Sequence, residues 1–253
     1  MKCAIITPIP LLETYAVLSD NYHLILGHIL TKEPQYMEFY KARAAEGDFV
    51  ILDNSAHEFG VGSNIDGLIN LAIEVGASEI VLPDRLFFGD DTLYYAQQAY
   101  YKVRREIPYI SIMGVPQGRT LAEYSECLQG LVELGVDTIG ISKDYEVWPG
   151  GLKSIVGLIL MMYPDIQIHL LGWGRDLTEL YKIGKLFKGR IRGVDSAKPL
   201  QYADCMTEIP SDPGQVMPEY PRRDLNFFHL DDSDIGMGIA LRNIQTFKKW
   251  SKG

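Results

Sequence analysis

Eight short apolar runs rich in β-branched residues recur along the chain, and stretches with helical periodicity separate most of them. Strands that alternate with helices form parallel sheets, and strands that are apolar throughout are covered on both faces. The sequence therefore predicts an α/β fold of the (β/α)₈ TIM-barrel class, with an open doubly wound sheet as the alternative. The predicted strands cover residues 3–9, 23–29, 49–53, 79–83, 110–115, 138–142, 166–171 and 190–195.

The spacing between these runs predicts helices, and it also marks one long loop. The connection at 11–21 is only weakly helical, whereas residues 201–236 contain four prolines together with Asp, Gly and Ser. Long loops inside compact domains are usually lids or binding elements. A length of 253 residues suits one barrel, so residues 1–253 are expected to form a single domain. The predicted helices cover residues 33–46, 64–76, 92–106, 121–135, 152–163, 175–187 and 239–250.

Composition restricts where such a chain works and what it binds. Its three cysteines lie far apart, so they form neither a disulfide framework nor a metal-ligand cluster, and a reducing compartment fits best. The first apolar run is broken by Pro8, Pro10 and Glu13, which is wrong for a signal peptide or a membrane span. We therefore expect a cytoplasmic protein without membrane contact. A net charge of −9 argues against a surface that grips phosphates everywhere but leaves room for a local basic patch.

Polar residues follow the predicted strands at the ends where (β/α)₈ barrels place their active sites. Each such residue alone would more often cap the next helix or form a turn. Several Asp residues and a Gln at the same end of consecutive units favour a site instead. The candidates at or beside the strand ends are Asp53, Asn54, His57, Glu58, Asp84, Gln117, Gly118, Gly140, Ile141, Lys143, Leu171, Gly172, Asp195 and Ser196.

The types of these residues indicate a chemistry. Two carboxylates that face each other across a pocket can cleave a glycosidic bond, one as nucleophile and the other as proton shuttle, and Asp195 and Asp53 are placed for this. Asp84 and Gln117 suit a flat heterocycle, because a carboxylate accepts N–H donors and an amide both donates and accepts. Guanine offers such an edge.

At these residues the sequence resembles the tRNA-guanine transglycosylase superfamily, through short motifs that share its order and spacing over residues 48–200. The chain lacks the Cys-x-Cys-x-x-Cys zinc motif of the tRNA enzymes and is shorter at its C-terminus. In this it is similar to the phage-encoded DNA-guanine transglycosylases. The motifs are ILDNSAHE (51–58), VPQG (115–118), GIS (140–142), HLLGWG (169–174) and VDSAKP (194–199).

The resemblance implies a glycosyltransferase that exchanges guanine in DNA for a free 7-deazaguanine base and so protects phage DNA from restriction. Asp195 would be the nucleophile that forms a covalent glycosyl intermediate, and Asp53 the general acid/base. No cofactor and no metal would be needed, and the partners would be DNA and the free base. The base-binding residues would be Asp84, Gln117, Gly118, Gly140, Ile141, Leu171 and Gly172, with Asn54, His57, Glu58, Lys143 and Ser196 as possible accessory residues.

Other functions remain open at this stage. The polymer would be tRNA instead of DNA in one alternative, and another is a catalytically silent barrel that binds a nucleobase or nucleic acid. A third is an unrelated sugar hydrolase with the same carboxylate pair. Lys143 and Lys198 adjoin the motifs and are the candidates for a nucleic-acid face. Aromatic residues that would receive a flipped base, or else pack under loops, are Phe87, Phe88, Trp148 and Trp173.

Overall fold

The computed structural model describes residues 1–173, 177–219, 227–230 and 235–253. Its strands form one sheet in the order β1-β8-β7-β6-β5-β4-β3-β2. Each strand from β2 to β8 lies beside its sequence neighbour and β1 lies beside β8, an order without the reversal that marks a doubly wound sheet. The predicted (β/α)₈ TIM-barrel class is confirmed. The strands are β1 (Lys2–Ile5), β2 (Tyr22–Leu26), β3 (Phe49–Asp53), β4 (Glu79–Val81), β5 (Ser111–Gly114), β6 (Thr138–Ser142), β7 (Gln167–Leu171) and β8 (Gly193–Ser196).

Helices follow the strands with few departures from the expected pattern. No helix among the described residues is long and apolar enough to cross a membrane. The helices are α1 (Leu12–Tyr15), α2 (Gly27–Leu30), α3 (Pro34–Ala45), α4 (Ala56–Phe59), α5 (Ile65–Val75), α6 (Gly89–Glu106), α7 (Leu121–Leu134), α8 (Gly151–Met162), α9 (Leu177–Leu186), α10 (Lys198–Asp204) and α11 (Met237–Ser251). Short 3₁₀ helices are η1 (Ile9–Leu11), η2 (Ala16–Leu18), η3 (Lys143–Val147) and η4 (Phe227–His229).

Several predicted bounds need correction. The strand predicted over 3–9 ends at Ile5, and the strand predicted over 190–195 begins at Gly193. The strand predicted over 23–29 ends at Leu26, and Gly27 begins the short helix α2. The loop predicted over 201–236 starts later than expected, because α10 continues to Asp204. Pro199 lies in the first turn of α10. Backbone N–H groups in a first turn have no partner within the helix, so proline, which lacks this group, is tolerated there. Parts of that loop, at 220–226 and 231–234, lie outside the described residues, as does the predicted helix start at 175–176.

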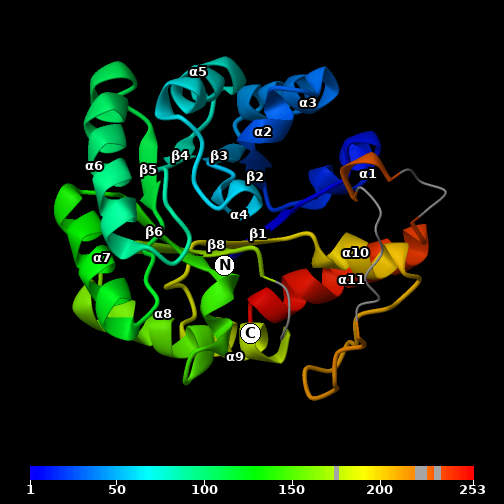
Figure 1. Ribbon diagram of the computed structural model, residues 1–253. Coiled ribbons are helices and arrows are strands. Elements are labelled where there is room, and N and C mark those ends of the chain that lie inside the picture. Colours follow the sequence, from blue (N-terminus) through cyan, green and yellow to red (C-terminus); the bar gives the residue numbers. More distant parts are fainter. Residues whose placement is uncertain (174–176, 220–226, 231–234) are drawn as a thin grey trace. The chain divides into compact units, whose positions relative to one another are not determined.

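The internal contacts divide the chain into two compact units, which are described separately below. The terminal unit comprises Met1–His23 and Ser142–Gly253. In it, β8 pairs in parallel with both β1 and β7, so that Gly193 is opposite Lys2 on one side and His169 on the other. Helix α11 packs against α10, α9 and β1, as its red ribbon shows in Figure 1.

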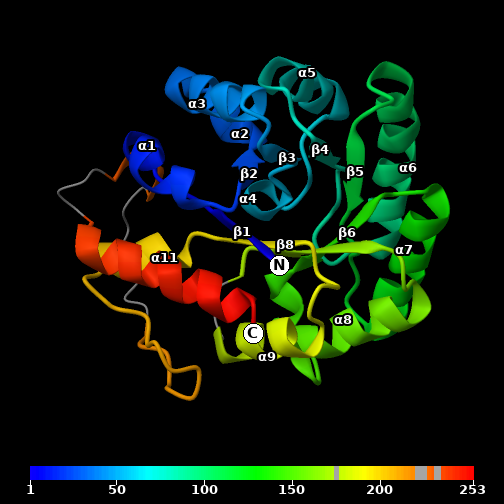
Figure 2. The same ribbon diagram turned by 180° about the vertical axis from the view of Figure 1, so that it is seen from behind.

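The central unit comprises Leu24–Ile141. Its strands β3, β4, β5 and β6 pair in parallel, and α6 packs along α7 while α3 packs on α5 (Figure 2). Fully buried aliphatic side chains such as Leu52, Ile80 and Ile139 fill the interior. Each such side chain stabilises the fold by roughly 1.5–3 kcal/mol. Because these apolar side chains are buried throughout the strands, polar groups gather at the strand ends.

Candidate active site

Asp195 lies on β8 of the terminal unit with its carboxylate buried and bonded on both oxygens. The backbone N–H of Gly172 donates to Oδ1 and Oδ2, at 3.1 Å each. The Nε2 atom of His169 lies 3.0 Å from Oδ1. Gly172 has a φ of 64°, a left-handed conformation that glycine adopts without steric cost and that turns the chain at the end of β7. The predicted residues Asp195 and Gly172 are therefore in direct contact.

His169 connects this carboxylate to the interior of the terminal unit. It lies on β7 with no solvent exposure, and its Nδ1 atom is 2.7 Å from the hydroxyl of Tyr22. Arg192 donates from Nε to the same hydroxyl at 3.1 Å. Buried polar groups are normally paired in this way, because an unpaired one loses the hydrogen bonds that it made with water. Asp195 is thus the end of a hydrogen-bond chain of four side chains.

Lys143 brings an amine to the same place. It directly follows β6 and is half-buried. A Cβ atom at Gly172 would be 3.5 Å from Lys143 Nζ and 3.4 Å from Lys143 Cδ, so the lysine side chain lies against Gly172. The residue that donates to the Asp195 carboxylate is therefore also a neighbour of the Lys143 side chain. The terminal unit assembles a lysine just after β6, a buried imidazole on β7 and a buried carboxylate on β8.

The remaining candidates of the terminal unit support the backbone. The hydroxyl of Ser196 donates to the carbonyl of Trp173 and accepts from the N–H of Lys198 at 3.0 Å. Trp173 was expected either to receive a flipped base or to pack under a loop. It is 1% exposed, which shows packing. Leu171 is half-buried at the end of β7.

In the central unit, the residues after β3 form a tight turn. The Asp53 carboxylate accepts from the N–H of Ser55 at 2.7 Å, and the Asn54 side-chain oxygen accepts from the N–H of Ala56 at 2.7 Å. Ser55 adopts a φ of 61°, and its hydroxyl lies 2.8 Å from Nδ1 of His28. The predicted accessory residues His57 and Glu58 are exposed on α4.

Asp84 is the centre of a second buried polar cluster. Its carboxylate accepts from the Asn54 amide at 2.7 Å and from the Gln117 amide at 2.6 Å. The Gln117 oxygen in turn accepts from the N–H of Phe87 at 3.0 Å. Burial raises the pKa of the Asp84 carboxyl to about 6, although the hydrogen bonds from Asn54 and Gln117 oppose this shift. The predicted base-binding side chains do meet, but they bond to one another.

The predicted glycine and isoleucine positions of the central unit have structural roles. A Cβ atom at Gly118 would be 2.9 Å from the backbone carbon of Glu123, so only glycine lets this loop pack on α7. Gly140 and Ile141 are buried within β6. Within the described ranges, no three His, Cys, Asp or Glu side chains gather as metal ligands would.

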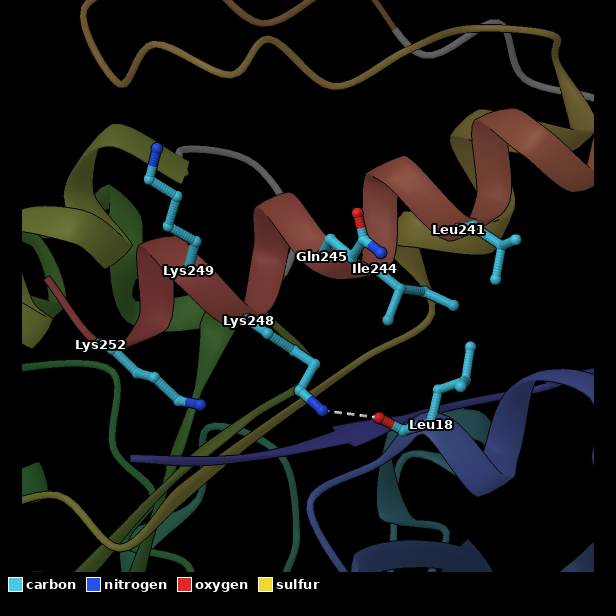
Figure 3. Close-up of a pocket in the computed structure, with 7 residues that line it drawn as sticks. All are labelled: Leu18, Leu241, Ile244, Gln245, Lys248, Lys249 and Lys252. Atoms are coloured by element: carbon cyan, nitrogen blue, oxygen red, sulfur yellow. Dashed lines mark hydrogen bonds between the residues drawn. The ribbon is translucent and has the colours of Figure 1, made fainter.

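A groove of about 360 Å³ lies along α11 in the terminal unit (Figure 3). Its Lys248 amine donates to the carbonyl of Leu18 at 2.8 Å and pairs with Asp20 at 2.6 Å, while Lys252 lies 3.9 Å from the same carboxylate. The positive charge of Lys248 is thus paired with the negative charge of Asp20. The groove is lined by Leu18, Leu241, Ile244, Gln245, Lys248, Lys249 and Lys252, none of them a candidate from the strand ends.

The sequence did not predict that three further residues of the chain belong to the Asp195 site. His169 stood inside a quoted motif, and its signal is a single ionisable side chain within an apolar strand. Tyr22 and Arg192 carry no such signal, because they lie at or just before strand starts and reach His169 only through the folded sheet.

Comparison with known proteins shows the fold and corrects the family. No known protein-family profile matches the chain, and no curated protein sequence does. Two solved structures that are similar are of N-acetylneuraminate lyase from Mycoplasma synoviae, in crystal forms II and I. Each is 15% identical with a TM-score of 0.50 and covers 77% of this chain, which in turn covers 68% and 67% of theirs. At this identity the likeness shows a shared fold.

The predicted membership of the guanine transglycosylase superfamily is therefore wrong, and so are the guanine-exchange activity and the glycosyltransferase class drawn from it. The short motifs misled for a physical reason. Asp53, Asn54 and Ser196 bond to the N–H groups two residues further on, as turn residues do after any strand. Phage DNA modification has no support from these comparisons, while DNA and a free 7-deazaguanine as partners stay untested predictions. What the comparisons establish is a (β/α)₈ barrel similar in fold to N-acetylneuraminate lyases.

Proposed function

We propose that this chain is a lyase-type enzyme that makes or breaks a bond next to a carbonyl group of its substrate. The Lys143 amine would act as nucleophile and the Asp195 carboxylate as proton acceptor. The observation that carries the proposal is the contact of the Lys143 side chain with Gly172, whose N–H donates to both Asp195 oxygens. The similar solved structures are lyases by name, which agrees with this class of reaction.

The chemistry requires only groups that the terminal unit brings together. The amine attacks the carbonyl carbon, and loss of water leaves an imine joined to Lys143. Once protonated, the imine draws electrons from the bond between the α and β carbons of the substrate, while Asp195 accepts the proton of the hydroxyl on the β carbon. The bond breaks, the β-carbon fragment leaves as an aldehyde or ketone, and the electron pair stays on the lysine-bound fragment as an enamine, whose carbon takes the proton from Asp195. Water then releases this fragment and restores the amine.

Two features of the site suit this reaction. The Asp195 carboxylate is fixed by three hydrogen bonds, from Gly172 and His169, so it is held in one orientation before the substrate arrives. Lys143 is half-buried, so part of this residue is open to solvent. A fixed base and a lysine on either side of Gly172 suit imine chemistry.

Reductive trapping tests the nucleophile. The full chain is incubated with pyruvate or hydroxyacetone as carbonyl probes in the presence of cyanoborohydride, and peptide mass spectrometry locates the secondary amine that forms. We expect one fast adduct, at Lys143, that is lost in Lys143→Arg. Lys153→Arg, which removes an exposed amine on α8 of the same unit, is the matched control and keeps the adduct.

Proton exchange tests the base. An enamine exchanges the pyruvate methyl protons with deuterium from solvent, and proton NMR follows the rate. Asp195→Asn is expected to slow this exchange by about 10²-fold or more while the Lys143 adduct still forms. Adducts that form on surface lysines at the same rate in wild type and Lys143→Arg would refute the proposed function.

A further inference from the structure

His169 has an unusual environment for an ionisable side chain. It lies on β7 between two fully buried residues, Ile168 and Leu170, and has no solvent exposure itself. Both ring nitrogens have partners, since Nε2 lies 3.0 Å from Asp195 Oδ1 and Nδ1 lies 2.7 Å from the Tyr22 hydroxyl. A neutral imidazole donates from one nitrogen and accepts at the other. The direction of these two bonds therefore decides what Asp195 receives.

The groups at the two ends of the chain, Arg192 and Asp195, set that direction. The Arg192 guanidinium can only donate, and its Nε lies 3.1 Å from the Tyr22 hydroxyl, so the phenol oxygen accepts there. The single phenol proton is then available for Nδ1 of His169, which becomes an acceptor. A carboxylate only accepts, so Nε2 must carry the ring proton that is donated to Asp195, and Nδ1 of the neutral ring then accepts the phenol proton. Each group in the chain donates toward the carboxylate.

Close packing keeps Tyr22 in this position. A Cβ atom at Gly193 would lie 2.6 Å from both the ring carbon Cζ and the hydroxyl of Tyr22, so the ring occupies the space that any larger residue would need. Two cations also face the ring, with Lys2 Nζ 5.9 Å and the Arg192 guanidinium carbon 5.7 Å from its centre. Gly193 is opposite His169 in the sheet, so the register itself brings Tyr22 and His169 together.

We propose that Arg192 and Tyr22 are positioning residues that hold His169 as the neutral Nε2–H tautomer and thereby keep Asp195 a fixed proton acceptor. The inference rests on the proposed function in one respect, namely that Asp195 is the base of the carbonyl reaction. The state of His169 does not depend on any substrate. It is therefore tested on the protein alone.

Nitrogen-15 NMR of the histidine side chains distinguishes the possible states. The full chain is labelled at its five histidines, and His169→Gln identifies the signal of His169. In the wild type at pH 7 we expect one protonated nitrogen, Nε2, and one unprotonated nitrogen, Nδ1. Tyr22→Phe removes the donor to Nδ1, so both nitrogens should move toward the averaged shifts of a ring without a fixed tautomer.

Arg192 has a close control. Arg192→Met should cause the same averaging, and Arg192→Lys, which restores a donor, should recover part of the wild-type pattern. Arg190→Met should leave the pattern unchanged, because Arg190 bonds to the carbonyl of Pro164 instead. A wild-type His169 protonated on Nδ1 or on both nitrogens would overturn the inference, as would a pattern unaffected by Tyr22→Phe. If reductive trapping fails while these results hold, the lyase proposal falls and the tautomer assignment stands.

Discussion

Ser55 shows how a single residue shapes a strand end. Its φ of 61° costs on the order of 1 kcal/mol or more for a residue other than glycine. The turn is held by the Asp53 carboxylate on the Ser55 N–H and by the contact of the Ser55 hydroxyl with His28. Burial lowers the pKa of His28, which favours the neutral imidazole beside this hydroxyl. The strain is therefore compensated locally, by residues next to β3.

The buried carboxyl of Asp84 is expected to make the stability of the protein depend on pH. Burial raises its pKa to about 6 in the folded protein, whereas an unfolded Asp titrates near 4. The folded state thus holds this proton more tightly, and stability falls as the pH rises from 4 to 6 and is constant above that range. This rise in the pKa of Asp84 corresponds to a change of roughly 3 kcal/mol in the free energy of unfolding. Urea unfolding of wild type and Asp84→Asn at several pH values measures the difference.

We expect the free energy of unfolding of wild type minus that of Asp84→Asn to fall by this amount between pH 4 and 6. Asp90→Asn removes an exposed carboxylate from the same unit and should leave the pH profile of the wild type in place. A difference between wild type and Asp84→Asn that does not vary with pH would contradict the buried-carboxyl account.

Helix α7 allows a prediction at the scale of an element. The Thr120 side chain accepts from the N–H of Glu123 and so caps the first turn. Thr120→Ala should lower the free energy of unfolding by about 1 kcal/mol, whereas Thr120→Ser keeps the hydroxyl and should stay close to wild type. Chemical denaturation measures both. An Ala variant as stable as the Ser variant would show that the cap contributes nothing.

Elements were easier to predict than the contacts between them. The alternation of apolar runs and periodic stretches predicted all eight strands, because burial inside a barrel leaves a direct mark on composition. Helix α10 was missed since Pro199 is typical of loops as well as of first helical turns. For the site, the sequence predicted only which residues lie at or beside the strand ends. The pairing of Tyr22 with His169 was not predictable, because it depends on sheet register and not on spacing along the chain.

At the scale of the whole molecule, the fold leaves the reaction undetermined. One barrel architecture supports many chemistries, because the catalytic groups come from loops and strand ends that vary independently of the core. Strand-end motifs in the right order suggested guanine exchange, and the same residues proved to form turns and internal hydrogen bonds. The proposed chemistry rests instead on how Lys143 and Asp195 are arranged around the backbone of Gly172.

The reactivity of the cysteines tests how well each unit buries its thiol. Cys3 belongs to the terminal unit and Cys127 to the central unit, and burial raises their pKa to about 11 and about 12 from an ordinary value of 9. Because the thiolate is the reactive form, these shifts alone should slow labelling by roughly 100-fold and 1000-fold at pH 8. Cys205 is half-buried and should react first. Time-resolved labelling with iodoacetamide, read by mass spectrometry, gives the three rates. Native protein in which Cys3 or Cys127 reacts as fast as Cys205 would contradict this burial, while denaturant should make all three rates equal.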